Sequence, residues 1–532
     1  MTLTPDSPAE SPDLAQHLDP WRYSKKKETM DLQRLEEVIL VAQGAPGIGG
    51  SKAQANAMLD SLRHASDRWT LGLKCFFEST SDTAKLFGLS LIRDYLSRAG
   101  CSQEVMDYRR TIRENMLCWS TSSVVSGMQI PSFIMNSVVT ILTLGIKFEY
   151  PRQWPGAFED LLPLAETGPH GVDLVVRILS ELEVEVVMFT EQRTDEEKRN
   201  NTMIKDNMRA SPVIANVVSL LCRNTVAMYH AGHNDLAERC LRCLAELISW
   251  IELQLVIQEA LPTLYRALSI PQFTAAACSC LYEILKKGMD SVIKVRMIHS
   301  IDMISALLTV PSICNGSASS SSPTASSLQG GASGIDSSNG NGTASDINSS
   351  NGSSSSSSCS SSGSGGGSSG NGQNGIGIQS LSDAWVEEYG LVIDMLFLEL
   401  LSCWGRFEDV IQAAAQGKEI DGATEYTEVA PLCATMLHTT MPIVLDIFSH
   451  ESNNVCATVL PALNKLMSTL RAQLLLAPGL IASQSQTFPA RYFAASDYVP
   501  MFLTAVYKQM QYEENFGFDA SDDDDVAVME VR

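Results

Sequence analysis

Basic side chains recur on one side of a predicted helix near the middle of the chain. Lys198, Lys205 and Arg209 are spaced by seven and four residues, so on an α-helix they fall within about 20° of one line. Arg199 lies beside them, and Asp206 is the one acid in this stretch. Such a basic stripe can contact the phosphates of a nucleic acid. The alternative is a solvated helix face with weak surface ion pairs, and composition alone favours that alternative.

The residues around this stripe predict where its helix begins and which side packs inward. Thr194 and Glu197 have the spacing of a capping box, so we expect the helix to begin there. Acidic residues fill the first turn, which suits the positive end of the helix dipole. Met203 and Ile204 lie opposite the stripe and are expected to pack inward, with Met208 on the flank.

Catalytic motifs are absent from the sequence. It contains no GxxxxGK[ST] phosphate loop, no HExxH metal motif and, outside the Ser/Gly/Asn-rich tract, no GxSxG nucleophile motif. The glycines between positions 44 and 50 follow an apolar run that is typical of a helix, so we interpret them as a linker. We therefore expect neither an enzyme nor a bound cofactor.

Other polar residues have simple structural explanations. Cys240 and Cys243 have CxxC spacing, but no second CxxC or matching histidine pair accompanies them, which disfavours a metal site. His230 and His233 are expected in an exposed turn between helices. Three closely spaced acids are interpreted as a solvated face rather than a catalytic pair: Glu181, Glu183 and Glu185.

The charge balance limits the kind of partner. The 532 residues include 61 acids and 38 Lys or Arg, which gives a formal net charge of −23. Such a chain repels nucleic acid on average and suits a basic protein, so RNA can bind only where the surface is locally basic. No secretory signal and no run of 18 apolar residues is present, so we expect no membrane insertion. The scattered cysteines indicate reduced core thiols in an intracellular compartment.

Hydrophobic periodicity predicts an all-α fold. Apolar residues recur at spacings of three and four for about four turns, and a Gly, Pro, Asn or Asp then ends each run. The helices come in pairs of roughly 40 residues, which is typical of HEAT repeats that stack into an α-α superhelix. The runs that illustrate the pattern are Leu236, Cys240, Cys243, Leu244, Leu247 and Ile251; Leu86, Leu89, Ile92, Tyr95 and Leu96; and Leu391, Met395, Leu398 and Leu401.

Composition divides the chain into five parts. Residues 1–30 are polar and expected to be disordered, and residues 31–311 carry the first block of repeats. Residues 312–379 are rich in Ser, Gly and Asn and form a flexible insertion in the solenoid. Further repeats occupy residues 380–511. Residues 512–532 form an acidic loop and the start of a truncated repeat, or alternatively a true acidic terminus.

Several stretches resemble exportin-T, the transfer-RNA exportin of the importin-β superfamily. The strongest is TDEEKRNNTMIKDNMR at residues 194–209. Others, in the same order as in that family, lie at residues 171–179, 249–253, 278–290 and 512–525. A less specific likeness to the N-terminal signature of the whole superfamily lies at residues 67–69 and 85–89.

This resemblance implies a carrier that shuttles between nucleus and cytoplasm. Such a carrier binds Ran-GTP through its N-terminal helices, holds mature transfer RNA on its concave surface and passes nuclear pore proteins. It releases its cargo when Ran hydrolyses GTP. The implied Ran-binding residues are Lys85, Phe87 and Arg93, although Phe87 is equally explained as a core residue. The implied RNA-binding residues are Lys198, Arg199, Lys205 and Arg209.

The chain departs from the family pattern in three ways. Its first 50 residues do not match, the Ser/Gly/Asn tract interrupts the repeats, and the C-terminal half is absent. Two alternatives stay open: another importin-β-type carrier, for protein import or for export of a different RNA, and a HEAT scaffold outside transport.

Overall fold

Helices follow one another along the chain in a computed structural model that describes residues 32–44, 50–98, 103–188, 191–314, 383–418, 420–475 and 495–510. Within these ranges no residue is in a β-strand. The predictions for residues 1–30, for nearly all of the 312–379 tract and for residues 512–532 concern segments outside the described residues.

The helices have the following bounds. In the N-terminal half they are α1 (Leu32–Gln43), α2 (Lys52–His64), α3 (Arg68–Glu78), α4 (Asp82–Arg98), α5 (Gln103–Val125), α6 (Ser132–Glu149), α7 (Ala157–Leu161), η2 (Leu162–Thr167), α8 (Pro169–Leu182), η3 (Glu183–Val187) and α9 (Asp195–Ala210). Then come α10 (Val213–His230), α11 (Asn234–Ile248), α12 (Leu253–Leu255), η4 (Val256–Ala260), α13 (Leu261–Leu268), α14 (Thr274–Lys286), α15 (Ser291–Ser300) and α16 (Met303–Cys314). The last group is α17 (Asp383–Ala415), α18 (Ala423–Phe448), α19 (Asn453–Thr458), α20 (Leu460–Leu475) and α22 (Ala495–Gln509).

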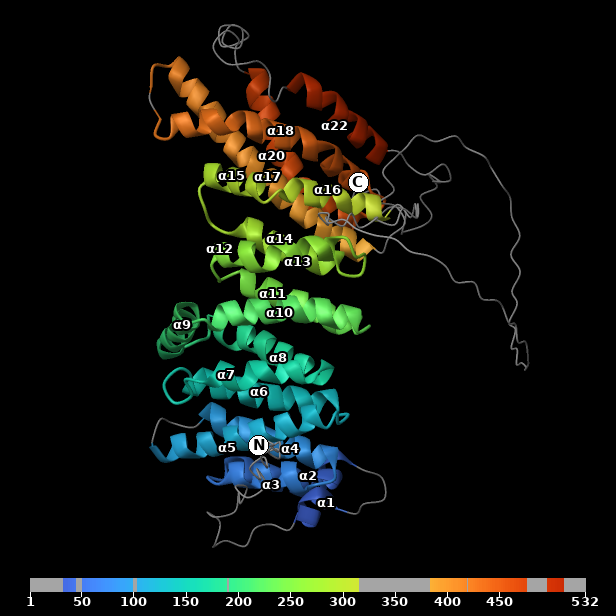
Figure 1. Ribbon diagram of the computed structural model, residues 1–532. Coiled ribbons are helices and arrows are strands. Elements are labelled where there is room, and N and C mark those ends of the chain that lie inside the picture. Colours follow the sequence, from blue (N-terminus) through green and yellow to red (C-terminus); the bar gives the residue numbers. More distant parts are fainter. Residues whose placement is uncertain are drawn as a thin grey trace, which may run out of the picture.

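These helices form two parallel rows that rise from the N-terminal to the C-terminal end of the stack (Figure 1). In one row α4, α6, α8, α11, α14 and α17 each pack against the next. In the other, α3, α5, α10 and α13 lie against α4, α6, α11 and α14. The all-α superhelix predicted from the periodicity is therefore confirmed.

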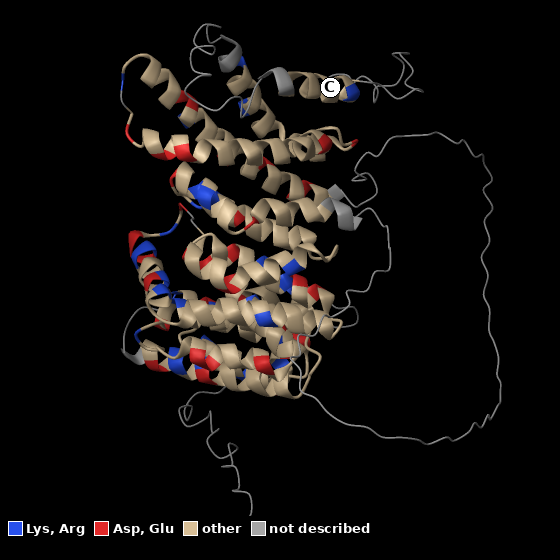
Figure 2. Ribbon diagram, turned by 45° about the horizontal axis from the view of Figure 1, so that its top comes forward, with Lys and Arg blue, Asp and Glu red and all other residues tan. Residues whose placement is uncertain are grey.

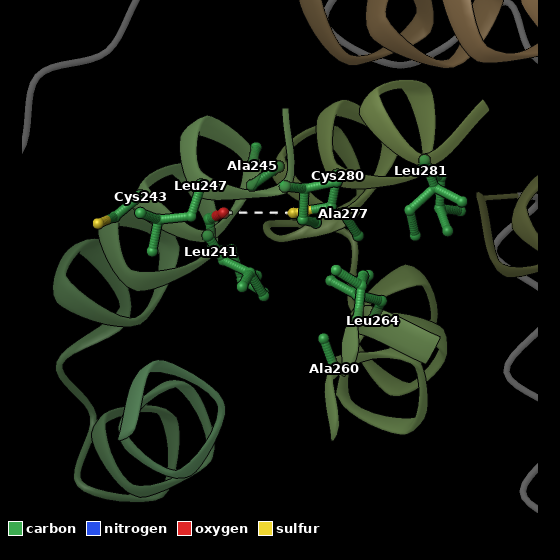
Figure 3. Packing of buried hydrophobic residues seen from close by; sticks show 14 of the residues in the cluster. Leu241, Cys243, Ala245, Leu247, Ala260, Leu264, Ala277, Cys280 and Leu281 are labelled. Atoms are coloured by element: carbon green, nitrogen blue, oxygen red, sulfur yellow. Dashed lines mark hydrogen bonds between the residues drawn. The ribbon is translucent and has the colours of Figure 1, made fainter. Parts of the chain in front are cut away.

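Small buried residues let neighbouring helices approach closely. Between α11 and α14 the Cys280 thiol donates a hydrogen bond of 3.3 Å to the carbonyl of Leu241 (Figure 3). Burial raises the pKa of the Cys240 thiol to about 12. Near α3 and α4, a Cβ on either Gly72 or Gly88 would lie 2.6 Å from the carbonyl oxygen of the other. The interpretation of these cysteines as core thiols is confirmed.

The predicted apolar faces are correct for α11 and partly wrong elsewhere. Every apolar residue that the periodicity assigned to the α11 face is buried, from Leu236 to Ile251. Leu86 and Leu391 are instead 37% and 40% exposed. In α17, Val392 and Leu396 are buried in place of Leu391, because this helix packs against helices on more than one side and its buried arc is wide.

Two helices, α6 and α18, are long and apolar enough to cross a membrane by length and composition. In α6, 61% of the apolar window is buried inside the protein, and in α18 the buried share is 56%. Core helices of a solenoid have this character, since both of their sides are covered by neighbours.

The stack continues from α16 to α17 across the long Ser/Gly/Asn tract. Lys294 on α15 is 4% exposed and donates a 2.6 Å hydrogen bond to Glu399 on α17. The buried Tyr389 hydroxyl donates to the Leu307 carbonyl of α16 at 3.1 Å. These contacts join the two blocks of repeats into one core.

Candidate nucleic-acid interface

Helix α9 projects from one edge of the stack (Figure 1). Its start is fixed by the predicted capping box. The Thr194 hydroxyl accepts a 3.2 Å hydrogen bond from the Glu197 amide, and the Glu197 carboxylate accepts one of 2.9 Å from the Thr194 amide. The hydrogen bond from the Thr194 amide also lowers the pKa of Glu197. The predicted helix start is confirmed.

One side of α9 packs on the solenoid. Asn201, Ile204 and Met208 are buried, whereas Met203 is only half-buried. The prediction that Met203 packs inward with Met208 on the flank is therefore wrong, because the two residues have exchanged places: Met208 packs inward and Met203 lies on the flank. Asn201, Ile204 and Met208 lie three and four residues apart, so they share the line that faces η3, α10 and α6, and Met203 falls beside it.

The predicted basic stripe lies on a second side of α9, which faces the following repeat. Arg209 donates hydrogen bonds of 2.8 and 3.2 Å to the Trp250 carbonyl, and its guanidinium lies 5.3 Å from the centre of the Trp250 ring. Arg209 also pairs with Asp206 at 3.2 Å, and Lys198 pairs with Asp195 at 3.8 Å. The hydrogen bonds of Arg209 are thus made within the protein, whereas the Lys198 side chain remains 43% exposed.

A second cation holds the same loop. Lys287, just after α14, donates hydrogen bonds of 3.0 and 2.7 Å to the carbonyls of Ser249 and Ile251. Arg209 and Lys287 together bind three consecutive carbonyls after α11. Residues 249–253, one of the stretches that resemble exportin-T, therefore form a loop clamped by side chains from α9 and α14.

The acids interpreted as a solvated face are half-buried and have partners within the protein. Glu183 accepts a 2.9 Å hydrogen bond from the Trp250 indole, Glu185 pairs with Lys147 at 2.7 Å, and Glu181 accepts one of 3.1 Å from Thr140. Burial raises the pKa of Glu183 to about 7. The interpretation as a solvated face is wrong because each of the three carboxylates contacts a side chain from another part of the stack. Glu183 and Glu185 lie in the π-helical turn η3, and Glu181 lies near the end of α8.

A cleft of about 920 Å³ opens on the third side of α9, toward α5 and the loop after α6. Figure 2 shows α9 at the edge of the stack with Lys and Arg interspersed among Asp and Glu. Four carboxylates line this cleft: Asp107, Glu149, Glu196 and Glu197. Six basic side chains also line it: Arg109, Arg110, Arg113, Lys147, Arg152 and Arg199. The basic surface that the sequence located on α9 alone therefore extends over two neighbouring helices.

Several of these cations are already paired. Arg113 contacts the carboxylate of Glu149, and Lys147 pairs with Glu185. Arg110 pairs with Glu114 at 2.8 Å. Of the RNA candidates, only Arg199 lines the cleft, because it lies about 100° around the helix from Lys198.

Sequence reasoning missed the arginines of α5. Arg109, Arg110 and Arg113 form a local basic cluster in an acidic chain, and Arg109 and Arg113 share a helix face at a spacing of four. This cluster of arginines could have been recognised in the sequence. The position of these arginines opposite Arg199 could not be recognised, since that position depends on how α5 and α9 flank the end of α6.

The implied Ran-binding residues lie on α4, near the N-terminal end of the stack and away from α9 (Figure 1). Phe87 is 8% exposed and packs in a small core with Leu35 and Ile39 of α1. Lys85 is half-buried, and the Arg93 side chain is 53% exposed. Phe87 therefore positions α4 through packing, which leaves the two cations as accessible groups.

Metal-binding geometry is absent from the part of the chain that the structure describes: no three His, Cys, Asp or Glu side chains are grouped to hold an ion. Cys240 and Cys243 are buried in α11. His230 and His233 lie exposed between α10 and α11, as predicted.

Comparison with known proteins shows which proteins this chain is similar to. Residues 131–281, from the start of α6 into α14, match the family model for exportin 1-like proteins. The chain is 29% identical to exportin-T of Danio rerio over 253 residues and 28% identical to exportin-T of Homo sapiens over 270 residues. It is 22% identical to exportin-T of Podospora anserina over 520 residues, which cover 94% of this chain. The chain is thus similar to exportin-T proteins and to the exportin 1-like family model.

The matched regions make up 26%, 28% and 42% of these three exportin-T chains. The chain thus spans less than half the length of these relatives. The family match includes α9 and the end of α6, whereas α5, which forms the other wall of the cleft, precedes the matched residues.

Proposed function

We propose that this exportin-T-like karyopherin is part of a nuclear export receptor that binds mature transfer RNA together with Ran-GTP. The carrier crosses the nuclear pore through pore proteins and releases its cargo in the cytoplasm. Ran supplies the GTP hydrolysis, and the carrier has no catalytic activity of its own. The observation that carries this proposal is the similarity to exportin-T, which extends in the fungal relative over 94% of the chain.

The surface chemistry supports an RNA cargo that is bound at restricted places. The formal net charge of −23 repels nucleic acid from most of the molecule. Lys198, Arg199, Lys205 and Arg209 are gathered on the projecting helix α9, and the α5 arginines lie across the cleft from Arg199. Phosphate contacts of this kind give RNA binding a strong salt dependence.

A second proposed interface, for a protein partner, lies on α4 at the N-terminal end of the stack. We propose Lys85 and Arg93 of α4 as Ran-facing residues, with Phe87 fixing the helix on α1. Charge reversal at Lys85 and Arg93 is expected to weaken Ran-GTP binding while leaving the fold intact, since neither residue belongs to the buried core.

Fluorescence anisotropy with labelled transfer RNA, in the presence and absence of Ran loaded with a GTP analogue, tests the proposal. The protein is compared with the same sequence extended to the length of its relatives, because carriers of this family grip cargo from both halves. We expect Ran to tighten RNA binding, as the reciprocity of linked binding requires.

Each alternative has its own outcome. RNA binding that is indifferent to Ran would remove the export mechanism. Ran binding that is coupled to a protein cargo, without RNA, would indicate another importin-β-type carrier. A chain that binds neither ligand would be a HEAT scaffold.

A further inference from the structure

Helix α9 is attached to two parts of the stack that are not next to each other. In its first half, the Asn200 amide donates a 2.7 Å hydrogen bond to the Lys147 carbonyl at the end of α6. At its end, Arg209 donates to the Trp250 carbonyl in the loop after α11. In the row of stacked helices, α8 lies between α6 and α11. With 16 residues α9 is about 24 Å long, so it runs along the edge of the stack past several helices (Figure 1).

The Trp250 loop is itself held by a later helix. Lys287, just after α14, donates to the carbonyls of Ser249 and Ile251 on either side of Trp250. Burial lowers the pKa of Lys287, and the nearby charge of Arg209 lowers it further. The two like charges lie together because the carbonyls at the C-terminal end of α11 favour cations. We call Arg209, Trp250 and Lys287 the latch, since they join α9 to α14 through this loop.

The geometry of the latch requires an arginine at position 209. The guanidinium lies 5.3 Å from the centre of the Trp250 ring and donates from two nitrogens to the carbonyl of the same residue. The Trp250 indole donates a 2.9 Å hydrogen bond to Glu183, which fixes the orientation of the ring. A lysine ammonium is a compact point charge that cannot stack on the ring and form both hydrogen bonds together.

Such an attachment restricts how the solenoid bends. In a solenoid each repeat contacts its neighbours, and small rotations between repeats add up to the curvature of the whole molecule. A helix joined to α6 at one end and to the α11–α14 loop at the other limits these rotations. The same contacts fix the direction of α9, which buries only one of its sides.

We infer that the latch holds α9 as a restraint between the α6 and α14 repeats, and that Arg209 and Lys287 are positioning residues for RNA binding. Arg209 acts through Trp250 and not by contact with a phosphate. The latch fixes the direction in which the exposed Lys198 and Arg199 meet the RNA. The positioning role rests on the proposed RNA cargo, whereas the restraint does not.

A distance measurement tests the restraint without RNA. Spin labels are introduced as unnatural amino acids at Thr202 on α9 and at Ile293 on α15, which are both exposed. Double electron–electron resonance should give a narrow distance distribution in the wild-type background. Arg209→Lys and Trp250→Leu should each broaden that distribution, because either change opens the latch. The matched control is Arg406→Gln, an exposed arginine on α17, which should leave the distribution unchanged.

Transfer-RNA affinity tests the positioning role. Arg209→Lys keeps the positive charge but loses the latch, so it should weaken binding roughly three- to tenfold, as much as Arg209→Gln does. Trp250→Leu removes no charge and should have a similar effect. Because both residues act in one latch, Arg209→Lys combined with Trp250→Leu should bind no more weakly than either single variant. Circular dichroism confirms that each variant is folded, and Arg406→Gln again serves as the control.

The outcomes separate this inference from the proposed function. If Arg209→Lys binds transfer RNA like the wild type while Arg209→Gln does not, Arg209 contacts a phosphate and the positioning role is wrong. Broadened distances with unchanged RNA affinity overturn that role as well. If no latch variant changes the distance distribution, the restraint is wrong. If distances respond to the latch variants but transfer RNA binds to no form, the restraint stands and the proposed cargo is wrong.

Discussion

At the level of single residues, Glu183 combines a structural role with an unusual titration. The π-helical turn η3 brings its carboxylate to the Trp250 indole, 67 residues further along the chain. Burial is the main cause of its raised pKa, with a smaller contribution from nearby Glu246, and Lys205 acts in the opposite direction. Because Arg209 also holds Trp250, this one ring links η3, α9 and the loop after α11.

Neutralising Glu183 should therefore change how stability depends on pH. The folded-state pKa of about 7 lies above the unfolded value near 4.5. The stability that the protonated Glu183 carboxyl contributes is fully present below pH 4.5 and is lost as the pH rises through 7. We expect Glu183→Gln to match the wild type at pH 5 and to be more stable by about 1–2 kcal/mol at pH 8, after allowance for solvent screening.

Urea unfolding between pH 5 and 8 measures this difference. Glu196→Gln, at an exposed position of α9, corrects for the loss of one negative charge. A stability difference between Glu183→Gln and wild type that stays constant with pH would show that Glu183 titrates normally in the folded protein.

At the level of elements, α9 depends on local signals more than its neighbours do. It projects from the stack and buries only one side, so its first turn relies on the capping box of Thr194 and Glu197. Its three sides have separate roles: one packs on the solenoid, one holds the Trp250 loop, and one faces the cleft with α5.

Removing the cap should loosen α9 without unfolding the protein. Thr194→Ala is expected to cost about 1 kcal/mol, since the Glu197 amide of the first turn loses the hydroxyl that caps it. Hydrogen exchange followed by mass spectrometry should show faster exchange at the start of α9 and unchanged exchange in α11. The control is Thr202→Ala, an exposed threonine within the same helix that bonds only to the Lys198 carbonyl. Equal effects of the two variants would argue against the cap.

At the level of the whole molecule, the solenoid is continuous across a long tract of low-complexity sequence. Contacts between α15, α16 and α17 bury Lys294 and Tyr389 against partners 105 and 82 residues away. The stability of the second block thus depends on tertiary contacts rather than on the connecting chain.

Shortening that connection should leave the protein folded. We expect replacement of residues 316–381 by a linker of about 12 Gly and Ser residues to keep stability or raise it by about 1–2 kcal/mol, because a shorter loop costs less entropy to close. Thermal and urea unfolding measure the change. Glu399→Gln leaves the Lys294 charge buried with a weaker partner and should cost about 3 kcal/mol in either background. A deletion that lowers stability as much as Glu399→Gln would assign the tract a structural role.

The sequence determined the local features of this protein. Periodicity predicted the helical stack and the buried face of α11, and Thr194 with Glu197 predicted the start of α9, because these signals act over three or four residues. The resemblance to exportin-T rests on short stretches in the same order along the chain, and the comparisons agree with it.

Tertiary structure alone decided which side of α9 is open. Arg209 lies on the predicted stripe, yet its hydrogen bonds go to Trp250, 41 residues away. Arg199, off the stripe, faces arginines of α5 that no periodicity connects to it. A helical pattern fixes which residues share a side of their own helix, but long-range packing determines which neighbour, or which space, that side meets.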